Sequence, residues 1–219
     1  SMNVISSESI SPQTKNEFFN LTKAEIENQI KETPNDARIY ILASSFYNSV
    51  GDWASALPII NKARELTPQK QTPMFNLAVN YINTGKPKEA VEIAKKAYEL
   101  ATDYPVAQSV YVVALINNGE EKKAKELFPN NPELFSDQRV ISIYMKNKQY
   151  DKAIVAYKEV LKKTPNDADI RSRLASVYYI SNQMQNAIAE LKVLKTLSPQ
   201  LNKEIDTVIK QIEEGKPVQ

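Results

Sequence analysis

The phrase TPND occurs twice in this chain, as Thr33–Asp36 and again as Thr164–Asp167. The flanking residues match as well, because KETPNDARI in the first copy corresponds to KKTPNDADI in the second. The two copies lie 131 residues apart. A phrase that recurs with its flanks at such a distance indicates that the chain is built from internal repeats.

The glycines give the length of the repeat. The chain has four glycines, and Gly51, Gly85 and Gly119 are spaced 34 residues apart. A fixed period of this size is typical of stacked helical units. Five alanines keep the same phase, with spacings of 34, 34, 29 and 34 that together span the distance between the TPND copies: Ala56, Ala90, Ala124, Ala153 and Ala187.

Each period contains the pattern of two helices. In residues 37–70, Tyr40, Ala43 and Tyr47 fall on one face of a first helix, and Gly51 can take the positive φ that ends it. Pro68 ends the second helix, because the residue before a proline is pushed out of the helical region. The face of this second helix carries small and apolar residues: Ala56, Ile60 and Ala63.

This pattern resembles the tetratricopeptide repeat (TPR) family, whose 34-residue motif pairs two helices with small residues where they cross. The resemblance implies an all-α fold, a right-handed α-solenoid of about five helix pairs in which the first helices line a concave groove and the second helices form the outer wall. The predicted TPR domain covers residues 14–213. It consists of an N-terminal helix (14–32), repeats at 37–70, 71–104, 105–133, 134–167 and 168–201, and a capping helix (202–213), between a disordered tail or tag remnant (1–13) and a short tail (214–219).

Four of the repeats depart from the motif. In the second repeat, Thr102 replaces the closing proline. Lys148 and Asn182 stand where the glycine is expected, and asparagine is the best substitute for a left-handed residue. The third repeat has only 29 residues, because its second helix is cut short by Phe128-Pro129. Two interpretations remain open for this repeat: a deletion in a surface turn, or a bend that reshapes the inner face.

The two ends carry single helices. The segment NKEIDTVIKQIEE places its isoleucines on one side, so it is predicted to cover the last repeat. The segment before Thr33 is amphipathic, with Phe18, Phe19, Ile26 and Ile30, and it falls where the second helix of a preceding repeat is expected. Either it is an N-terminal cap, or the chain is cut from a longer protein inside a linker.

A second, narrower resemblance bears on that choice. Thr33–Arg38, Ser45–Tyr47 and Thr67–Gln71 resemble the C-terminal TPR tail of bacterial O-antigen ligase or polymerase proteins, and the resemblance is best over residues 14–128. It implies a domain on the extracytoplasmic face of the bacterial cytoplasmic membrane, attached to a multi-pass parent chain. A free-standing protein is expected in the cytoplasm. The catalytic part of that family does not lie in this sequence, so its activity does not transfer.

Composition excludes several classes of function. Histidine and cysteine are absent, which removes the Ser-His-Asp arrangement, cysteine nucleophiles and most zinc sites. The net charge of +2 gives no general attraction to nucleic acid or to lipid. There is no run of 18 apolar residues, and the start of the sequence lacks the pattern of a signal peptide. We therefore expect a non-catalytic protein without cofactor or metal. The resemblance to TPR proteins implies that it binds a protein or peptide, and the narrower resemblance implies that it meets a membrane only through a parent chain. The oligomeric state is not predicted.

The TPR resemblance implies which residues line the groove. The apolar members can instead pack between repeats, since apolar stripes on helices are usually core. The predicted partner-binding residues are Arg38, Ile41, Ser45, Asn48, Phe75, Val79, Ile82, Asn83, Val113, Ile116, Asn117, Gln138, Ser142, Met145, Ser176 and Tyr179.

The clamp with which some TPR proteins grip a terminal carboxylate is not predicted here. Ile41 and Ser45 stand where that clamp has lysine and asparagine. Arg38, Arg139 and Arg173 are the remaining candidates for holding a carboxylate or phosphate. Surface arginines are more often solvated or paired with a neighbouring acid.

Overall fold

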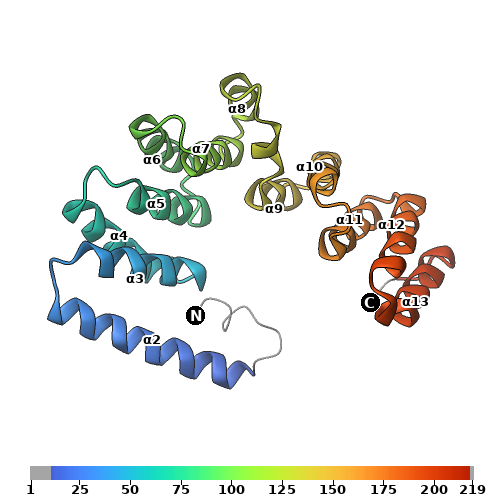
Figure 1. The fold of residues 1–219 in the computed structure, drawn as a ribbon, viewed down its shortest axis with the longest axis horizontal. Coiled ribbons are helices and arrows are strands. Elements are labelled where there is room, and N and C mark those ends of the chain that lie inside the picture. The colour runs from blue at the N-terminus through green and yellow to red at the C-terminus, as the bar shows by residue number, and fades with distance from the viewer. Residues whose placement is uncertain (1–10, 218–219) are drawn as a thin grey trace. The chain divides into compact units, whose positions relative to one another are not determined.

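The computed structural model describes residues 11–217, and every regular element in that part of the chain is a helix (Figure 1). The prediction of an all-α fold built of helix pairs is therefore confirmed. The chain divides into two compact units, Ser1–Glu121 and Lys122–Gln219. The boundary falls inside the short third repeat. No helix in residues 11–217 is both long enough and apolar enough to cross a membrane.

The first unit contains two layers of helices. Helices α3, α5 and α7 lie side by side in one layer, and α4 and α6 pack against them from the other (Figure 1). Helix α2 packs against α3. The helices of this unit are α2 (Pro12–Glu32), α3 (Ala37–Ser49), α4 (Trp53–Leu66), α5 (Gln71–Asn83), α6 (Pro87–Leu100) and α7 (Pro105–Asn117).

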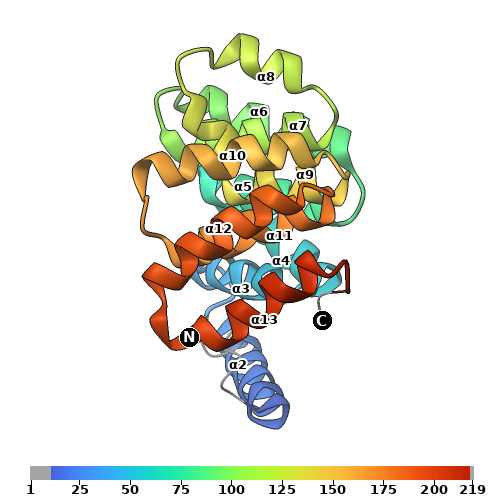
Figure 2. The ribbon, with the colours of Figure 1, turned by 90° about the vertical axis from the view of Figure 1, so that its right-hand side faces the viewer.

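The second unit continues the alternation of helices. Helix α10 packs against α9 and α11, and α12 packs against α11 and α13. Figure 2 shows α13 alongside α12. The elements are α8 (Glu121–Leu127), which begins at the boundary, the 3-10 helix η1 (Pro132–Ser136), α9 (Gln138–Lys146), α10 (Tyr150–Lys163), α11 (Ala168–Ile180), α12 (Met184–Leu197), the 3-10 helix η2 (Pro199–Leu201) and α13 (Asn202–Glu213).

The turn inside each helix pair has the same backbone geometry. Its central residue is left-handed, with φ of 76° at Gly51, 73° at Gly85 and 81° at Gly119. The two non-glycine residues at this place, Lys148 and Asn182, have φ of 56° and 61°. In all five turns the next amide donates back to the first helix, over 2.8–2.9 Å, as in a Schellman motif: Asp52 to Tyr47, Lys86 to Tyr81, Glu120 to Leu115, Gln149 to Tyr144 and Gln183 to Tyr178.

The two TPND copies are equivalent joints between repeats. Asp36 and Asp167 are the N-caps of α3 and α11, and their carboxylates accept bonds from main-chain amides in the first turn of each helix. In each copy, the side chain six residues after the proline donates a hydrogen bond to the carbonyl of that proline. Tyr40 Oη donates to the carbonyl of Pro34 at 3.0 Å, and the guanidinium of Arg171 donates to the carbonyl of Pro165.

The core depends on small residues at the helix crossings. The five alanines that keep the 34-residue phase are all fully buried, at 0% exposure: Ala56, Ala90, Ala124, Ala153 and Ala187. A methyl group at these places lets two helix backbones approach closely, and a larger side chain would not fit without strain.

Element boundaries differ from the predictions in two places. Helix α2 begins at Pro12 and is capped by Ser11, whereas the predicted tail ran through residue 13 and the predicted helix began at residue 14. The first helix of the fourth repeat begins only at Gln138, because Asp137 caps it and η1 precedes it. The short second helix predicted for the third repeat agrees with α8, which has seven residues and ends directly before Phe128. The predictions for residues 1–10 and 218–219 lie outside the described residues.

Candidate partner-binding surfaces

A network of amides and hydroxyls joins the first helices of the first two repeats. Asn48 Nδ2 on α3 donates to the carbonyl of Asn76 on α5 at 2.9 Å. Asn76 Nδ2 donates in turn to Ser44 Oγ at 2.8 Å and to Ser45 Oγ at 3.0 Å. Two of the predicted groove residues, Ser45 and Asn48, therefore hold α3 and α5 together, and the amide donor of Asn48 is already used within the protein.

The apolar residues predicted on α3 and α5 remain partly accessible. Ile41, Phe75, Val79 and Ile82 are all half-buried. They occupy positions that recur along the layer of first helices, and the ring of Phe75 lies 6.2 Å from that of Tyr104. We call these four side chains the inner patch. Its surface is apolar, so it can bind a partner by burying hydrocarbon.

The prediction that Val113 and Ile116 lie on the open side of α7 is wrong. They are 2% and 5% exposed, and every residue from Tyr111 to Ile116 is buried. A helix that is apolar on nearly all its faces is packed on all sides. These two residues therefore belong to the core and offer almost no surface to a ligand. Asn117, which follows the buried run, is half-buried, and Asn83 is exposed with its amide bonded to Val79 of its own helix.

The three candidate arginines are each paired with a nearby aspartate. Arg38 bonds Asp36, and Arg139 bonds Asp137, at 2.6 and 2.7 Å. Arg173 bonds the aspartate one turn earlier on α11 at 2.9 Å. The side-chain hydrogen bond with Arg38 lowers the pKa of Asp36, and the same bond raises the pKa of Arg38. An anionic ligand would have to compete with these carboxylates, so the geometry does not favour an anion site here.

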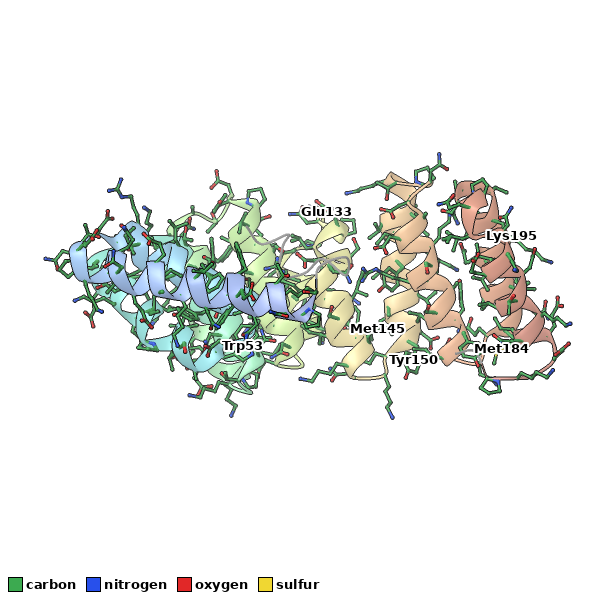
Figure 3. All side chains as sticks on the ribbon, turned by 90° about the horizontal axis from the view of Figure 1, so that it is seen from below. Trp53, Glu133, Met145, Tyr150, Met184 and Lys195 are labelled. Carbon is green, nitrogen blue, oxygen red and sulfur yellow. The ribbon has the colours of Figure 1, made fainter. Side chains whose placement is uncertain are left out.

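The predicted partner-binding residues of the second unit lie on two different helices. Gln138 and Ser142 are exposed on α9, and Ser142 Oγ donates to the carbonyl of Gln138 at 2.8 Å. Met145, labelled in Figure 3, is half-buried near the end of the same helix. Ser176 and Tyr179 on α11 instead line a pocket of about 500 Å³. The structure therefore does not bring these five residues together in one pocket.

This pocket, which we call the terminal pocket, was not predicted from the sequence. Its walls come from α11, α12, Leu201 of η2 and α13, the helix that was expected to cover the last repeat. The capping helix thus leaves part of α11 open. The lining residues from α12 and α13 are Leu191, Leu194, Glu204, Ile205, Val208 and Ile212.

Two asparagines in the first unit were also missed. Asn76 is the central member of the α3–α5 network. Asn80 is 1% exposed and donates to the carbonyl of Trp53 at 2.8 Å, at the start of α4. A signal was present, because an asparagine in an apolar helix must find a partner if it is buried. The sequence does not show which partner it finds.

The described residues were also searched for a metal site. Within residues 11–217 no group of three or more histidine, cysteine, aspartate or glutamate residues is placed to hold a metal ion. The inner patch and most of the lining of the terminal pocket are apolar, and Glu204 is the charged residue in that lining. What they can do is bury a complementary apolar surface.

Comparisons with known proteins agree with this architecture. Residues 73–104 match a tetratricopeptide repeat model, and residues 142–182 match a TPR repeat model. The search of curated proteins found no match to the sequence. The narrower resemblance to O-antigen ligases has no support among the matches.

Several solved structures share the fold. A thermophilic TPR protein of Thermus thermophilus is 20% identical, with 80% of this chain and 98% of that chain covered at a TM-score of 0.54. The Pseudomonas aeruginosa pilF structure is 16% identical, with 82% and 87% covered at a TM-score of 0.54. At such identities a common structure shows the fold and not the function. Two segments of this chain, residues 73–104 and 142–182, therefore match models of tetratricopeptide repeats, and they lie in an all-helical fold of helix pairs.

Proposed function

We propose that this protein is a non-catalytic scaffold that binds a protein or peptide partner at the inner patch. The observation that carries the proposal is the partial exposure of Ile41, Phe75, Val79 and Ile82 at recurring positions on α3 and α5. Repeat proteins of this kind generally serve as scaffolds for protein–protein interaction, and they use the surface formed by their stacked units. A patch of this kind supports burial of an apolar segment of a partner.

The network of hydrogen bonds between α3 and α5 holds the inner patch in a fixed arrangement. The side chains of Asn48 and Asn76 fix α3 against α5, so the patch does not have to be ordered when a ligand arrives. Preorganisation of this kind reduces the entropic cost of binding. The exposed amide of Asn83 and the half-buried amide of Asn117 lie at the ends of their helices and supply polar groups beside the apolar surface.

The proposal is tested with a phage-displayed library of unstructured peptides selected on the whole chain. We expect selected peptides to lose at least about tenfold in affinity for the double variant Phe75→Ser with Ile82→Ser, because each removes an apolar contact. Circular dichroism should show unchanged helicity in this variant.

A matched control carries the same type of change on second helices. Leu100 on α6 and Val155 on α10 are both exposed. The double variant Leu100→Ser with Val155→Ser should bind the selected peptides as well as the wild-type protein does. Peptides that bind the inner-patch variant and the wild type equally would show that the partner lies elsewhere.

A second candidate function is an accessory domain of a multi-pass membrane glycan ligase or polymerase, which positions a partner protein or a polysaccharide on the extracytoplasmic face. The resemblance of Thr33–Arg38, Ser45–Tyr47 and Thr67–Gln71 to O-antigen ligase tails favours it. The test is the full open reading frame: this candidate requires many apolar spans upstream of residue 1. A short reading frame would leave only the free-standing scaffold, which we expect in the cytoplasm.

A further inference from the structure

We infer that the terminal pocket is a second binding site, which takes an amphipathic α-helix of a partner protein through spaced apolar side chains and one basic side chain. This inference rests on the proposed scaffold function and adds the place, the conformation and the chemistry of a ligand. The pocket lies wholly in the second unit, so it is separate from the inner patch.

The pocket arises from the way the last helix packs. In the first unit, α5 packs on α3 and α4, and α7 packs on α5 and α6, so each first helix is covered by the next first helix. Helix α13 follows α12 in the same order but packs on α12 and η2, and the pocket lies between it and α11. Lys195 near the end of α12 (Figure 3) donates to Asp206 of α13 at 2.5 Å. One flank of α11 therefore lacks the helix that a further repeat would place there.

The walls of the pocket are apolar and partly exposed. Ile180 and Leu201 line it and are 49% and 43% exposed. Leu191, Leu194 and Ile205 also line the pocket and are buried. A volume of about 500 Å³ lies within the range of ligand-binding pockets. Large aliphatic or aromatic side chains of a ligand would cover the two exposed residues and gain the free energy of burying both surfaces.

The scarcity of polar partners favours a helical ligand over an extended one. Apart from the first turn of α13, the walls are helical segments whose main-chain groups are mostly bonded within the helix. Three hydroxyl groups line the pocket, those of Ser172, Ser176 and Tyr179, and Ser176 Oγ already donates to the carbonyl of Ser172 at 3.0 Å. An extended peptide would bury amides and carbonyls without partners, which is costly. A helix satisfies its own main chain and presents only side chains.

The charge at the pocket favours a basic helix over a fatty acid as the ligand. Among the described residues that line the pocket, Glu204 is the one charged side chain. A carboxylate attracts a lysine or arginine of a partner and repels the carboxylate of a fatty acid. Helix α2 of a second copy is a poor occupant, because its apolar side already packs on α3, where the rings of Phe19 and Phe46 stack at 5.6 Å. The chemistry therefore fits a basic amphipathic helix from another protein.

The test uses a phage-displayed library built on an alanine-rich helical frame with one face randomised. Selection on the whole chain should enrich peptides with apolar residues at i, i+3 or i+4 and i+7 and a lysine or arginine beside them. The double variant Ile180→Ser with Leu201→Ser should bind these peptides at least about tenfold more weakly. Glu204→Gln should weaken binding by up to about fivefold, as expected for an exposed ion pair.

Controls separate this inference from the proposed function. Both pocket variants should keep the melting temperature of the wild type, and Phe75→Ser with Ile82→Ser should still bind the selected helices. Failure to enrich any helical peptide overturns the inference, as does equal binding to the pocket variants. The inference is also overturned if only the inner-patch variant, and neither pocket variant, weakens binding of the selected helices. That result would still support the proposed function. A fluorescent fatty acid that binds the wild type but not the pocket variants would identify a lipid site instead. Self-association lost in those variants would identify a second copy as the occupant.

Discussion

The side-chain amide of Asn48 on α3 donates to the main-chain carbonyl of Asn76 on α5, over 2.9 Å. Asn76 also bonds in the other direction, because its side-chain amide donates to Ser44 and Ser45 on α3. The two asparagines therefore fix the helices that carry the inner patch. A binding surface on helices is held most accurately when its supporting residues are themselves hydrogen-bonded.

We predict that Asn76→Ala lowers the free energy of unfolding by about 1–2 kcal/mol, because two hydrogen bonds between helices are lost at a poorly solvated site. The measurement is the midpoint of urea denaturation. Asn83→Ala is the matched control, since this exposed amide bonds only its own helix. The control should change stability by less than about 0.5 kcal/mol. Equal effects of the two substitutions would show that the network does not hold the helices.

A substitution in the turn at Lys148 is predicted to raise the free energy of unfolding, whereas Asn76→Ala lowers it. Lys148 has φ of 56°, in a turn where three other repeats have glycine. A side chain in this left-handed region costs about 1–2 kcal/mol relative to glycine, part of which the flexible unfolded glycine offsets. Lys148→Gly should therefore stabilise the protein by about 0.5–1 kcal/mol. Lys146→Gly, two residues earlier at the last position of α9, should instead destabilise it by up to about 1 kcal/mol. A lower melting temperature for Lys148→Gly would contradict this account.

The periodicity of the sequence predicted the fold because repeated units make repeated local structure. The same left-handed turn follows from glycine at three positions, and the prediction that Asn182 can take this conformation is confirmed. The alanines in phase marked the close helix crossings, and all five are buried. These features depend on a few neighbouring residues, so the local sequence contains them.

The accessible surface could be predicted only in part, because it depends on what covers each helix. Val113 occupies the same position in its repeat as Val79, yet Val113 is buried and Val79 is half-buried. The motif places a residue on a face of a helix but does not say whether that face is open. The terminal pocket was missed for the same reason: the residues of α13 were predicted as a cap, but the gap between α11 and α13 is set by tertiary packing.

The alanine phase gives a third prediction. Ala90 on α6 is fully buried at 0% exposure. Ala90→Leu adds three heavy atoms to a close helix crossing, which should cost about 1–3 kcal/mol through displaced side chains and backbone. Thermal melting followed by circular dichroism measures the effect. Lys96→Leu on the exposed side of the same helix adds similar bulk without strain and should melt like the wild type. If Ala90→Leu also melted at the wild-type temperature, the assigned phase of the repeats would be incorrect.

The last prediction concerns the second TPND loop. Arg171 donates to the carbonyl of Pro165 and to Glu190 of α12, the latter over 2.7 Å, and the side chains of this ion pair are only 18% and 19% exposed. Arg171→Met keeps the apolar stem but removes all of these bonds. We expect it to destabilise the second unit by about 1–3 kcal/mol, because Glu190 is left without its partner.

Arg173 on the same helix is the control. It shows whether the effect of Arg171→Met comes from losing a positive charge or from losing the bonds to Pro165 and Glu190. Its ion pair with Asp169 lies one turn apart on α11 and is exposed. Arg173→Met should therefore change the free energy of unfolding by less than about 0.5 kcal/mol. Combining Arg171→Met with Glu190→Gln should give a double-mutant coupling energy of about 1 kcal/mol or more, since the two residues act through one contact. Because the pair is partly buried, the coupling should persist at high salt. Additive effects of the two substitutions would mean that Arg171 acts only through the carbonyl of Pro165.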